Sequence, residues 1–238
     1  MTVTFADVST IVVDIEGTTS KTSHVFEVLF PYARTRIAHW VQNSPRIDVA
    51  AVAQQAASLL GKSEVSDVEL ISSLEKWSDE DVKASPLKTV QGEIWREGFE
   101  FGDLTSHLFD DVAPQLHAWH AQGLALHVFS SGSVTAQKSW FSHTDAGNLA
   151  ALFSGYFDTV TAGNKRETDS YGAIADALAK TPSEILFLTD VVQEADAAEQ
   201  AGWKVVLLAR DGEPHAEAAR AQTKFPVVTS FEEINFTN

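Results

Sequence analysis

Residues 10–20 of the chain read TIVVDIEGTTS, a β-branched apolar run that ends in two carboxylates, Asp14 and Glu16. A short run of this kind is typical of a strand that is buried on both faces of a parallel sheet. In open parallel α/β sheets, ligands bind beyond the carboxyl ends of the strands. The acid pair therefore indicates a binding or catalytic site at the edge where this strand ends.

Three more apolar runs follow later in the chain, and helix-like segments lie between them. The predicted strands are 10–14, 124–129, 184–189 and 203–208. The predicted helices between the last three strands are 133–143, 167–180 and 192–201. Gly123 and Gly202 each stand between a helical pattern and a strand, where a left-handed C-cap is common. This alternation predicts a doubly wound, parallel-sheet α/β domain.

The long stretch between the first two predicted strands shows helical periodicity only. The predicted helices in it are 26–42, 47–60, 67–77, 87–99 and 111–121. A single crossover between parallel strands needs only a dozen or more residues, so this block is too long for one connection. We therefore predict two domains, an α/β core of residues 1–20 plus 115–238 and an all-helical cap of residues 21–114 inserted after the first strand.

The composition limits the partners of the protein. Its 238 residues carry 17 Lys+Arg, 33 Asp+Glu and no cysteine, which gives a formal net charge of −16. This charge repels nucleic acid and anionic membranes, and no apolar run approaches the ~20 residues of a membrane span. The absence of cysteine and of a signal-like N-terminus predicts a cytoplasmic protein, and the absence of an exposed apolar stripe predicts a monomer.

Polar groups follow the other predicted strands as well. Ser130 and Ser131 follow LALHVF, Asp190 follows EILFLT with Glu194 one helical turn later, and Lys165 lies between these segments. Taken singly, such residues are more often turn residues, helix caps or solvated charges. Their joint position at strand ends predicts that they meet in one site. Two interpretations of Glu194 stay open, an outer carboxylate near a metal or a partner of the helix dipole.

In their order along the chain, these groups resemble the four motifs of the haloacid dehalogenase superfamily of phosphohydrolases. The resemblance implies that Asp14 attacks phosphorus and forms an aspartyl-phosphate. It implies that Glu16 protonates the leaving oxygen and then activates water. It also implies a Mg²⁺ ion held by Asp14, the backbone carbonyl of Glu16 and Asp190, because a hard cation prefers oxygen ligands.

The same resemblance assigns the remaining strand-end groups to the phosphate. Ser130, with the backbone amides of residues 131 and 132, is expected to hold phosphoryl oxygens. Lys165 is expected to offset the negative charge that Asp14 and the phosphate share. Ser130, Ser131 and Lys165 are therefore the predicted phosphate-binding residues.

A closer resemblance covers nearly the whole chain. The segments that carry it are DIEGTTS (14–20), VLFPYA (28–33), LKTVQGEIW (87–95), SSGSVTAQK (130–138), GNKRETDSY (163–171) and ILFLTDVVQEADAA (185–198). They are similar to the enolase-phosphatase family of methionine salvage, also called acireductone synthases, in which Glu replaces the usual Asp at position 16. The resemblance implies enolisation of a small phosphorylated diketone, 2,3-diketo-5-methylthiopentyl 1-phosphate, followed by loss of phosphate to leave the acireductone.

Two positions in the predicted cap depart from the family pattern. His24 stands where the family usually has Phe, and Val90 stands where Leu is more common, so the side-chain specificity of the cap stays open. Trp95 shares a helical face with Lys88 and Gln91. Either Lys88 binds a polar substrate group and Trp95 forms an apolar wall for the thioether, or this is an ordinary amphipathic face.

Other functions and one chemical role also stay open. Another capped phosphatase, acting on a different small phosphorylated metabolite, would carry the same motifs. A phospho-accepting receiver domain also combines acids, a hydroxyl and a lysine on a parallel sheet, but it is about half as long and has no helical insertion. The base of the enolisation is either Glu16 or a residue of the cap. We expect the cap to close over Asp14 and to exclude water.

Overall fold

The computed structural model describes residues 2–237 of the chain. It divides into two compact units. The larger unit comprises the residues up to Thr22 together with those from Thr105 onward, and the smaller unit is Ser23–Leu104.

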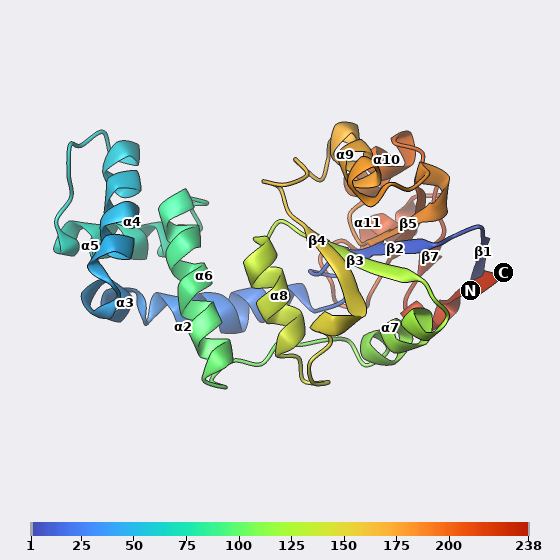
Figure 1. The fold of residues 1–238 in the computed structure, drawn as a ribbon, viewed down its shortest axis with the longest axis horizontal. Helices are drawn as coiled ribbons and strands as arrows, with labels where there is room; N and C mark the ends of the chain where they lie inside the picture. Colours follow the sequence, from blue (N-terminus) through green and yellow to red (C-terminus); the bar gives the residue numbers. More distant parts are fainter. Residues whose placement is uncertain (1, 238) are drawn as a thin grey trace. The chain divides into compact units, whose positions relative to one another are not determined.

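A six-stranded parallel sheet forms the centre of the larger unit. Its strands are β2 (Thr10–Val13), β3 (Ala125–Phe129), β4 (Phe153–Phe157), β5 (Ile185–Thr189), β6 (Lys204–Leu208) and β7 (Val227–Val228). They lie in the order β4-β3-β2-β5-β6-β7, so β2 pairs with both β3 and β5 (Figure 1). The winding reverses at β2, which places the switch in strand order at the end of the strand that precedes Asp14.

Helices cover both faces of this sheet. They are α7 (Val112–Ala121), α8 (Val134–Ser142), α9 (Thr168–Leu178), α10 (Val192–Gln200) and α11 (Ala216–Ala221). Figure 1 shows α9 and α10 on one side of the sheet and α7 on the other. Tyr171 of α9 and Ala195 of α10 share one buried core with Phe129 and Phe187 of the sheet. Because β2 and β5 are buried along their whole length, they contain continuous apolar runs.

Short elements complete the larger unit. Three 3-10 turns are η2 (Ala150–Leu152), η3 (Pro182–Glu184) and η4 (Phe231–Glu233). A separate two-stranded parallel sheet pairs β1 (Val3–Ala6) with β8 (Ile234–Thr237), which brings the two ends of the chain together (Figure 1).

The four predicted strands and the three helices between them are confirmed as β2, β3, β5, β6 and α8 to α10. Gly123 and Gly202 have φ of 84° and 88°, which confirms the predicted left-handed caps. The sequence did not predict β4, because Ser154 and Gly155 interrupt its apolar run. Gly155 is required there, since a Cβ atom would lie only 2.9 Å from Nδ1 of His127 on the neighbouring strand.

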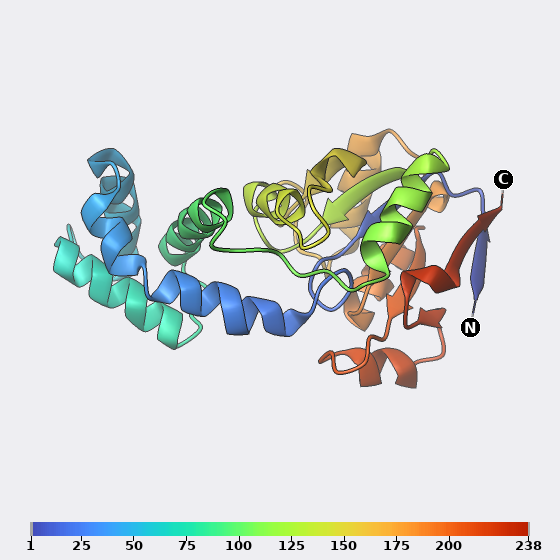
Figure 2. The ribbon, with the colours of Figure 1, turned by 90° about the horizontal axis from the view of Figure 1, so that it is seen from below.

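The smaller unit contains only helices, as the periodicity of its sequence predicts. The helical run from Thr22 comprises α1 (Thr22–His24), the π-helical segment η1 (Val25–Leu29) and α2 (Phe30–Arg34). The other helices are α3 (Ile37–Asn43), α4 (Arg46–Leu59), α5 (Asp67–Asp79) and α6 (Ser85–Glu100), coloured blue to green in Figure 2. Buried side chains such as Ile37, Val52, Leu70 and Ile94 form their common core.

The single helix predicted over residues 26–42 is two helices, with a break after Arg34. The hydroxyl of Thr35 donates to the carbonyls of Pro31 at 3.2 Å and Tyr32 at 3.1 Å. A threonine that bonds back to the preceding turn bends a helix. The helix therefore ends here, and the next helix, α3, begins at Ile37.

The chain re-enters the larger unit at Thr105, ten residues before the predicted domain boundary at residue 115. Residues 105–114, which the prediction placed in the cap, lie in the larger unit. Phe109 N donates to the carbonyl of Thr19 at 3.1 Å, and Asp111 pairs with Arg210 at 2.6 Å. These partners are distant in sequence, so no local pattern marks them. Among residues 2–237, no helix combines the length and the apolarity that crossing a membrane requires.

Candidate active site

The larger unit contains a cavity at the carboxyl ends of its strands. Its volume is ≈ 120 Å³. The residues that line it are Asp14, Glu16, Thr22, Ser130, Ser131, Lys165, Asp190, Val191, Glu194 and His215. The structure thus brings together all seven site residues that the sequence predicted for the core.

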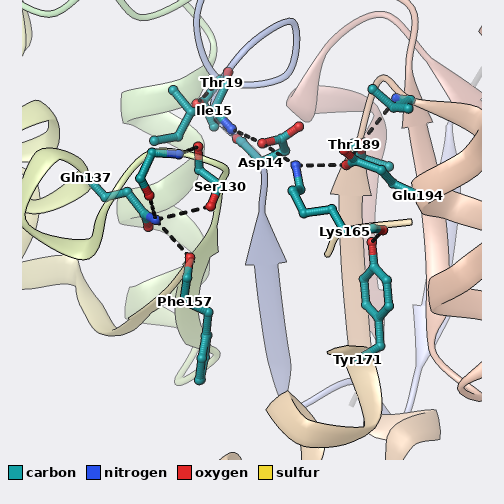
Figure 3. Close-up of polar contacts among 12 residues, drawn as sticks. Asp14, Ile15, Thr19, Ser130, Gln137, Phe157, Lys165, Tyr171, Thr189 and Glu194 are labelled. Carbon is teal, nitrogen blue, oxygen red and sulfur yellow. Dashed lines mark hydrogen bonds and ion pairs between the residues drawn. The ribbon is translucent and has the colours of Figure 1, made fainter. Parts of the chain in front are cut away.

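Asp14 directly follows β2 and is only 5% exposed. Its Oδ1 atom accepts the N–H of Ile15 at 2.7 Å and contacts Nζ of Lys165 at 2.7 Å (Figure 3). Within residues 2–237, no group donates a hydrogen bond to Oδ2. The carboxylate is therefore held by one oxygen, and the other oxygen is available to a ligand.

The turn after Asp14 places Glu16 at the cavity. The N–H groups of Thr18, Thr19 and Ser20 all point to the carbonyl of Ile15 at 3.3, 3.0 and 2.9 Å. Gly17 has a φ of 71°, and a Cβ atom at this position would overlap the carboxylate of Asp190. Only glycine satisfies both conditions, so the turn and Asp190 can lie against each other.

Lys165 lies in the loop before α9 and is 6% exposed. Besides Asp14, its Nζ contacts Oε2 of Glu194 at 2.8 Å. Burial opposes the positive charge, but the two carboxylates outweigh it and hold the pKa of Lys165 above its ordinary value. The hydroxyl of Tyr171 donates to the carbonyl of Lys165 at 2.7 Å (Figure 3). Lys165 is thus a fixed cation at physiological pH.

Glu194 lies in the first turn of α10 and is buried. Its Oε2 accepts the hydroxyl of Thr189 at 2.9 Å in addition to its contact with Lys165. Burial raises the pKa of Glu194 above its ordinary value, and the Lys165 ammonium partly offsets this effect. The contact with Lys165 suits an outer carboxylate, and the position in the first helical turn also suits the helix dipole.

Asp190, at the end of β5, is the most isolated acid of the site. It is 2% exposed, and neither carboxylate oxygen accepts a hydrogen bond from another residue within 2–237. Burial, together with the charges of Asp14 and Glu194, raises the pKa of Asp190 to about 8. A buried carboxylate without a donor is unfavourable unless a cation pairs with it.

The donor set of the cavity fits a hard divalent cation. Asp14 and Asp190 place carboxylate groups at the cavity, and Glu16 also lines it. Mg²⁺ binds through one or two carboxylates and keeps several waters, so this set is sufficient. Among residues 2–237, no three His, Cys, Asp or Glu side chains are grouped as metal ligands, which leaves the third ligand to the main chain or to water.

Ser130 and Ser131 begin the loop after β3. Ser130 N donates to the carbonyl of Phe157 at 3.2 Å, and the Ser130 hydroxyl accepts the N–H of Gly132 at 3.3 Å. The amide of Gly132, which was predicted to bind the phosphate, is thus bonded within the loop in this structure. The N–H of Ser131 donates to no protein group in the part of the chain that the structure describes.

Three cavity residues were not singled out from the sequence. Val191 simply follows Asp190, but Thr22 and His215 come from segments without a recognisable motif. The N–H of Thr22 donates to Oε2 of Glu213 at 2.9 Å, which connects the start of α1 to the loop after β6. Only this long-range packing brings Thr22 and His215 to the cavity, so no local signal in the sequence could have found them.

The two predicted cap contacts lie on α6 in the smaller unit. Lys88 is exposed. Trp95 donates its Nε1–H to the carbonyl of Leu29 at 2.7 Å and stacks on Phe30 with ring centroids 5.9 Å apart. Packing within the helices accounts for these contacts of Trp95, and a role of either residue toward substrate stays a prediction.

Comparisons with known proteins agree with this site. The family model for haloacid dehalogenase-like hydrolases matches residues 8–202. The protein called Enolase-phosphatase E1 from Frankia alni is 49% identical over 222 residues, which cover 93% of this chain and 92% of that protein. Its namesake from Alcanivorax borkumensis is 43% identical over 97% of this chain and 100% of that protein. The crystal structure of UTR4 protein from Saccharomyces cerevisiae matches with a TM-score of 0.77 and 31% identity, covering 94% of this chain and 99% of that chain.

Proposed function

The chain belongs to the haloacid dehalogenase-like hydrolases and, among them, to the enolase-phosphatases, and from this premise we propose its reaction. It enolises 2,3-diketo-5-methylthiopentyl 1-phosphate and then hydrolyses the phosphate ester. The product is acireductone, 1,2-dihydroxy-3-keto-5-methylthiopentene, an intermediate of methionine salvage. The observation that carries the proposal is that Asp14, Glu16, Ser130, Lys165 and Asp190 line one cavity in a chain 49% identical to an enolase-phosphatase.

Asp14 is the proposed nucleophile. Its Oδ2 attacks phosphorus, and the ester oxygen leaves as the bond from Asp14 to phosphorus forms. Glu16 gives a proton to that leaving oxygen and then takes a proton from a water molecule. The water attacks the phosphorus of the aspartyl-phosphate, which releases inorganic phosphate and restores the carboxylate of Asp14.

Mg²⁺ is the proposed cofactor, held by Asp14, the carbonyl of Glu16 and Asp190. When bound, it offsets the negative charge that would keep an anionic nucleophile away from a phosphate ester. The two buried oxygens of Asp190 that lack a donor support this assignment. On the other side of the phosphate, Ser130 and Ser131 hold phosphoryl oxygens, and Lys165 stabilises the charge that these oxygens share with Asp14.

The enolisation needs a base that removes a proton from carbon. Glu16 is one candidate because it lines the cavity and acts on the neighbouring ester oxygen in the second step. A residue of the helical unit Ser23–Leu104 is the other. In this proposal that unit is a cap that excludes water during turnover, with Lys88 and Trp95 as candidate substrate contacts. The protein acts as a cytoplasmic monomer without nucleic acid or membrane partners, in keeping with its net charge of −16.

One experiment tests the reaction as a whole. Enol absorbance and released phosphate are followed together on the diketone phosphate while Mg²⁺ is varied, with a panel of sugar phosphates as competing substrates. We expect the enol signal to precede phosphate release, and phosphate release to stop with a chelator while the fold is retained. Phosphate release from the sugar phosphates without any enol signal would instead identify a different capped phosphatase.

A further inference from the structure

Gln137 on α8 is one of the most deeply buried polar residues of the larger unit. It is 1% exposed, and its side-chain nitrogen reaches three main-chain carbonyls (Figure 3). Nε2 lies 2.7 Å from the carbonyl of Gly132, 2.8 Å from that of Phe157 and 3.5 Å from that of Ser130. One amide group thus connects the loop after β3 to the end of β4.

The side-chain oxygen of Gln137 shows which part of the amide the fold uses. Oε1 of Gln137 is buried and accepts no hydrogen bond from residues 2–237. A buried acceptor without a partner is unfavourable, and an apolar side chain of similar size would avoid it. The donors on Nε2 are therefore the part of Gln137 that the fold uses.

These donors determine which way the neighbouring N–H groups point. In a trans peptide the C=O and the following N–H point in opposite directions. A carbonyl of Ser130 turned toward Gln137 therefore directs the N–H of Ser131 away from Gln137. Ser131 lines the cavity, and within the described residues its N–H donates to no protein group. That N–H, which has no protein acceptor among the described residues, is therefore a candidate donor to an anionic oxygen in the cavity.

We propose that Gln137 is a positioning residue that holds the Ser130–Gly132 loop with the N–H of Ser131 directed at a phosphoryl oxygen. The inference rests on the proposed function, because it requires a phosphate group in the cavity. Gln137 itself does not line the cavity and acts only through the loop carbonyls. Without its donors, the buried carbonyls turn toward other partners, and the N–H groups turn with them.

Gln222 provides a matched control for this role. Its Nε2 also donates to two carbonyls, those of Ala219 at 3.1 Å and Phe225 at 3.2 Å. Its Oε1 accepts the N–H of Lys224 at 2.7 Å. Gln222 thus stabilises a loop in the same way as Gln137, but this loop lies between α11 and β7 and does not line the cavity.

The test compares Gln137→Met with Gln222→Met in the full chain. Both variants lose the donors without gaining charge, and both are expected to lower Tm. The Kd of inorganic phosphate is measured by calorimetry at saturating Mg²⁺. It is expected to rise about tenfold in Gln137→Met, a loss of ~1.4 kcal/mol in binding free energy. In Gln222→Met it is expected to rise less than about twofold. KM should rise with this Kd, because the contact is made before and during the reaction.

Each result of this experiment decides between the alternatives. If Gln137→Met folds, loses Tm as Gln222→Met does and keeps the wild-type Kd, then Gln137 is only structural and the inference is overturned. If Gln137→Met does not fold, Gln137→Asn takes its place, because it keeps the amide but is one methylene too short, and the same tenfold rise is expected. Wild-type protein that binds no phosphate would overturn the proposed function, and this inference with it.

Discussion

The cavity has two sides that use different chemistry, and Figure 3 shows both. On one side, Asp14, Lys165 and Glu194 form a chain of buried ion pairs. On the other side, the loop at Ser130 is held by neutral groups, above all the side chain of Gln137. We refer to these as the charged side and the neutral side. Removal of one member of a buried ion pair leaves an uncompensated charge and costs about 3–5 kcal/mol of stability. Loss of a neutral hydrogen bond usually costs only about 0.5–1.5 kcal/mol.

This one site divides two tasks between two kinds of interaction. The charged side holds the proposed nucleophile and its counter-charge, and there the ion pairs fix the positions of the residues. The neutral side must present N–H and O–H groups at fixed angles, and there directed hydrogen bonds to carbonyls determine the geometry. We therefore expect substitutions on the charged side to affect the rate of reaction more than substitutions on the neutral side.

The largest effect is expected from Asp14→Asn. Asparagine has the shape of aspartate and leaves Lys165 paired with Glu194, so the fold should be retained. Because the nucleophilic oxygen is lost, phosphate release should fall by at least about 10⁴-fold. Phosphate assays on folded, purified variant test this. Substantial release by Asp14→Asn would show that another group on the charged side is the nucleophile.

The next effect is expected from Lys165→Met. The variant leaves Asp14 and Glu194 buried without their shared cation, so kcat should fall by about 10²–10³-fold and the free energy of unfolding by about 3–5 kcal/mol. Steady-state kinetics and urea denaturation measure both values. Lys180→Met is the control, since Lys180 donates to the hydroxyl of Ser9. Equal losses in kcat for the two variants would remove the special role of the charged side.

A smaller effect is expected from Tyr171→Phe, which tests whether the hydrogen bond from Tyr171 to the main chain of Lys165 positions that lysine. The ring packs against Phe187 and stays in place, and only the hydrogen bond to the carbonyl of Lys165 is lost. We expect less than about a tenfold loss of kcat and a loss of ~1 kcal/mol in stability. Tyr156→Phe is matched, because its hydroxyl donates to the carbonyl of Ala150. If Tyr156→Phe reduces kcat as much, the account of Lys165 positioning is wrong.

The smallest effect on catalysis is expected from His127→Leu, in β3. This variant should instead change how the stability of the protein depends on pH. Burial, with a contribution from Lys180, lowers the pKa of His127 to about 4. In the unfolded chain His127 takes up a proton near pH 6.5, whereas in the folded chain it stays neutral until about pH 4. The free energy of unfolding is therefore highest above pH 6.5 and falls as the pH is lowered toward 4. Denaturation between pH 7.5 and 4.5 should show a shallower decline for the variant than for wild type. An unchanged slope would mean that other groups cause the acid sensitivity.

The sequence predicted the residues at the strand ends, on both sides of the cavity, better than the residues that hold them in place. Asp14 and Asp190 each follow an apolar strand directly, so the pattern that reveals the strand also reveals the acid. Gln137 and Tyr171 gave no such signal, because on a predicted helix each is an ordinary residue, and their partners are carbonyls 5 to 20 residues away. The strand β4, which supplies one of those carbonyls, was missed because Ser154 and Gly155 interrupt its apolar run.

The most direct test is a crystal structure of the wild-type chain with inorganic phosphate and Mn²⁺, a substitute for Mg²⁺ that anomalous scattering can locate. The account predicts one metal ion bound by Asp14, the carbonyl of Glu16 and Asp190. It also predicts that the phosphate oxygens contact Lys165 and the N–H of Ser131. A metal ion bound without Asp190, or a phosphate that does not touch the loop at Ser130, would contradict it.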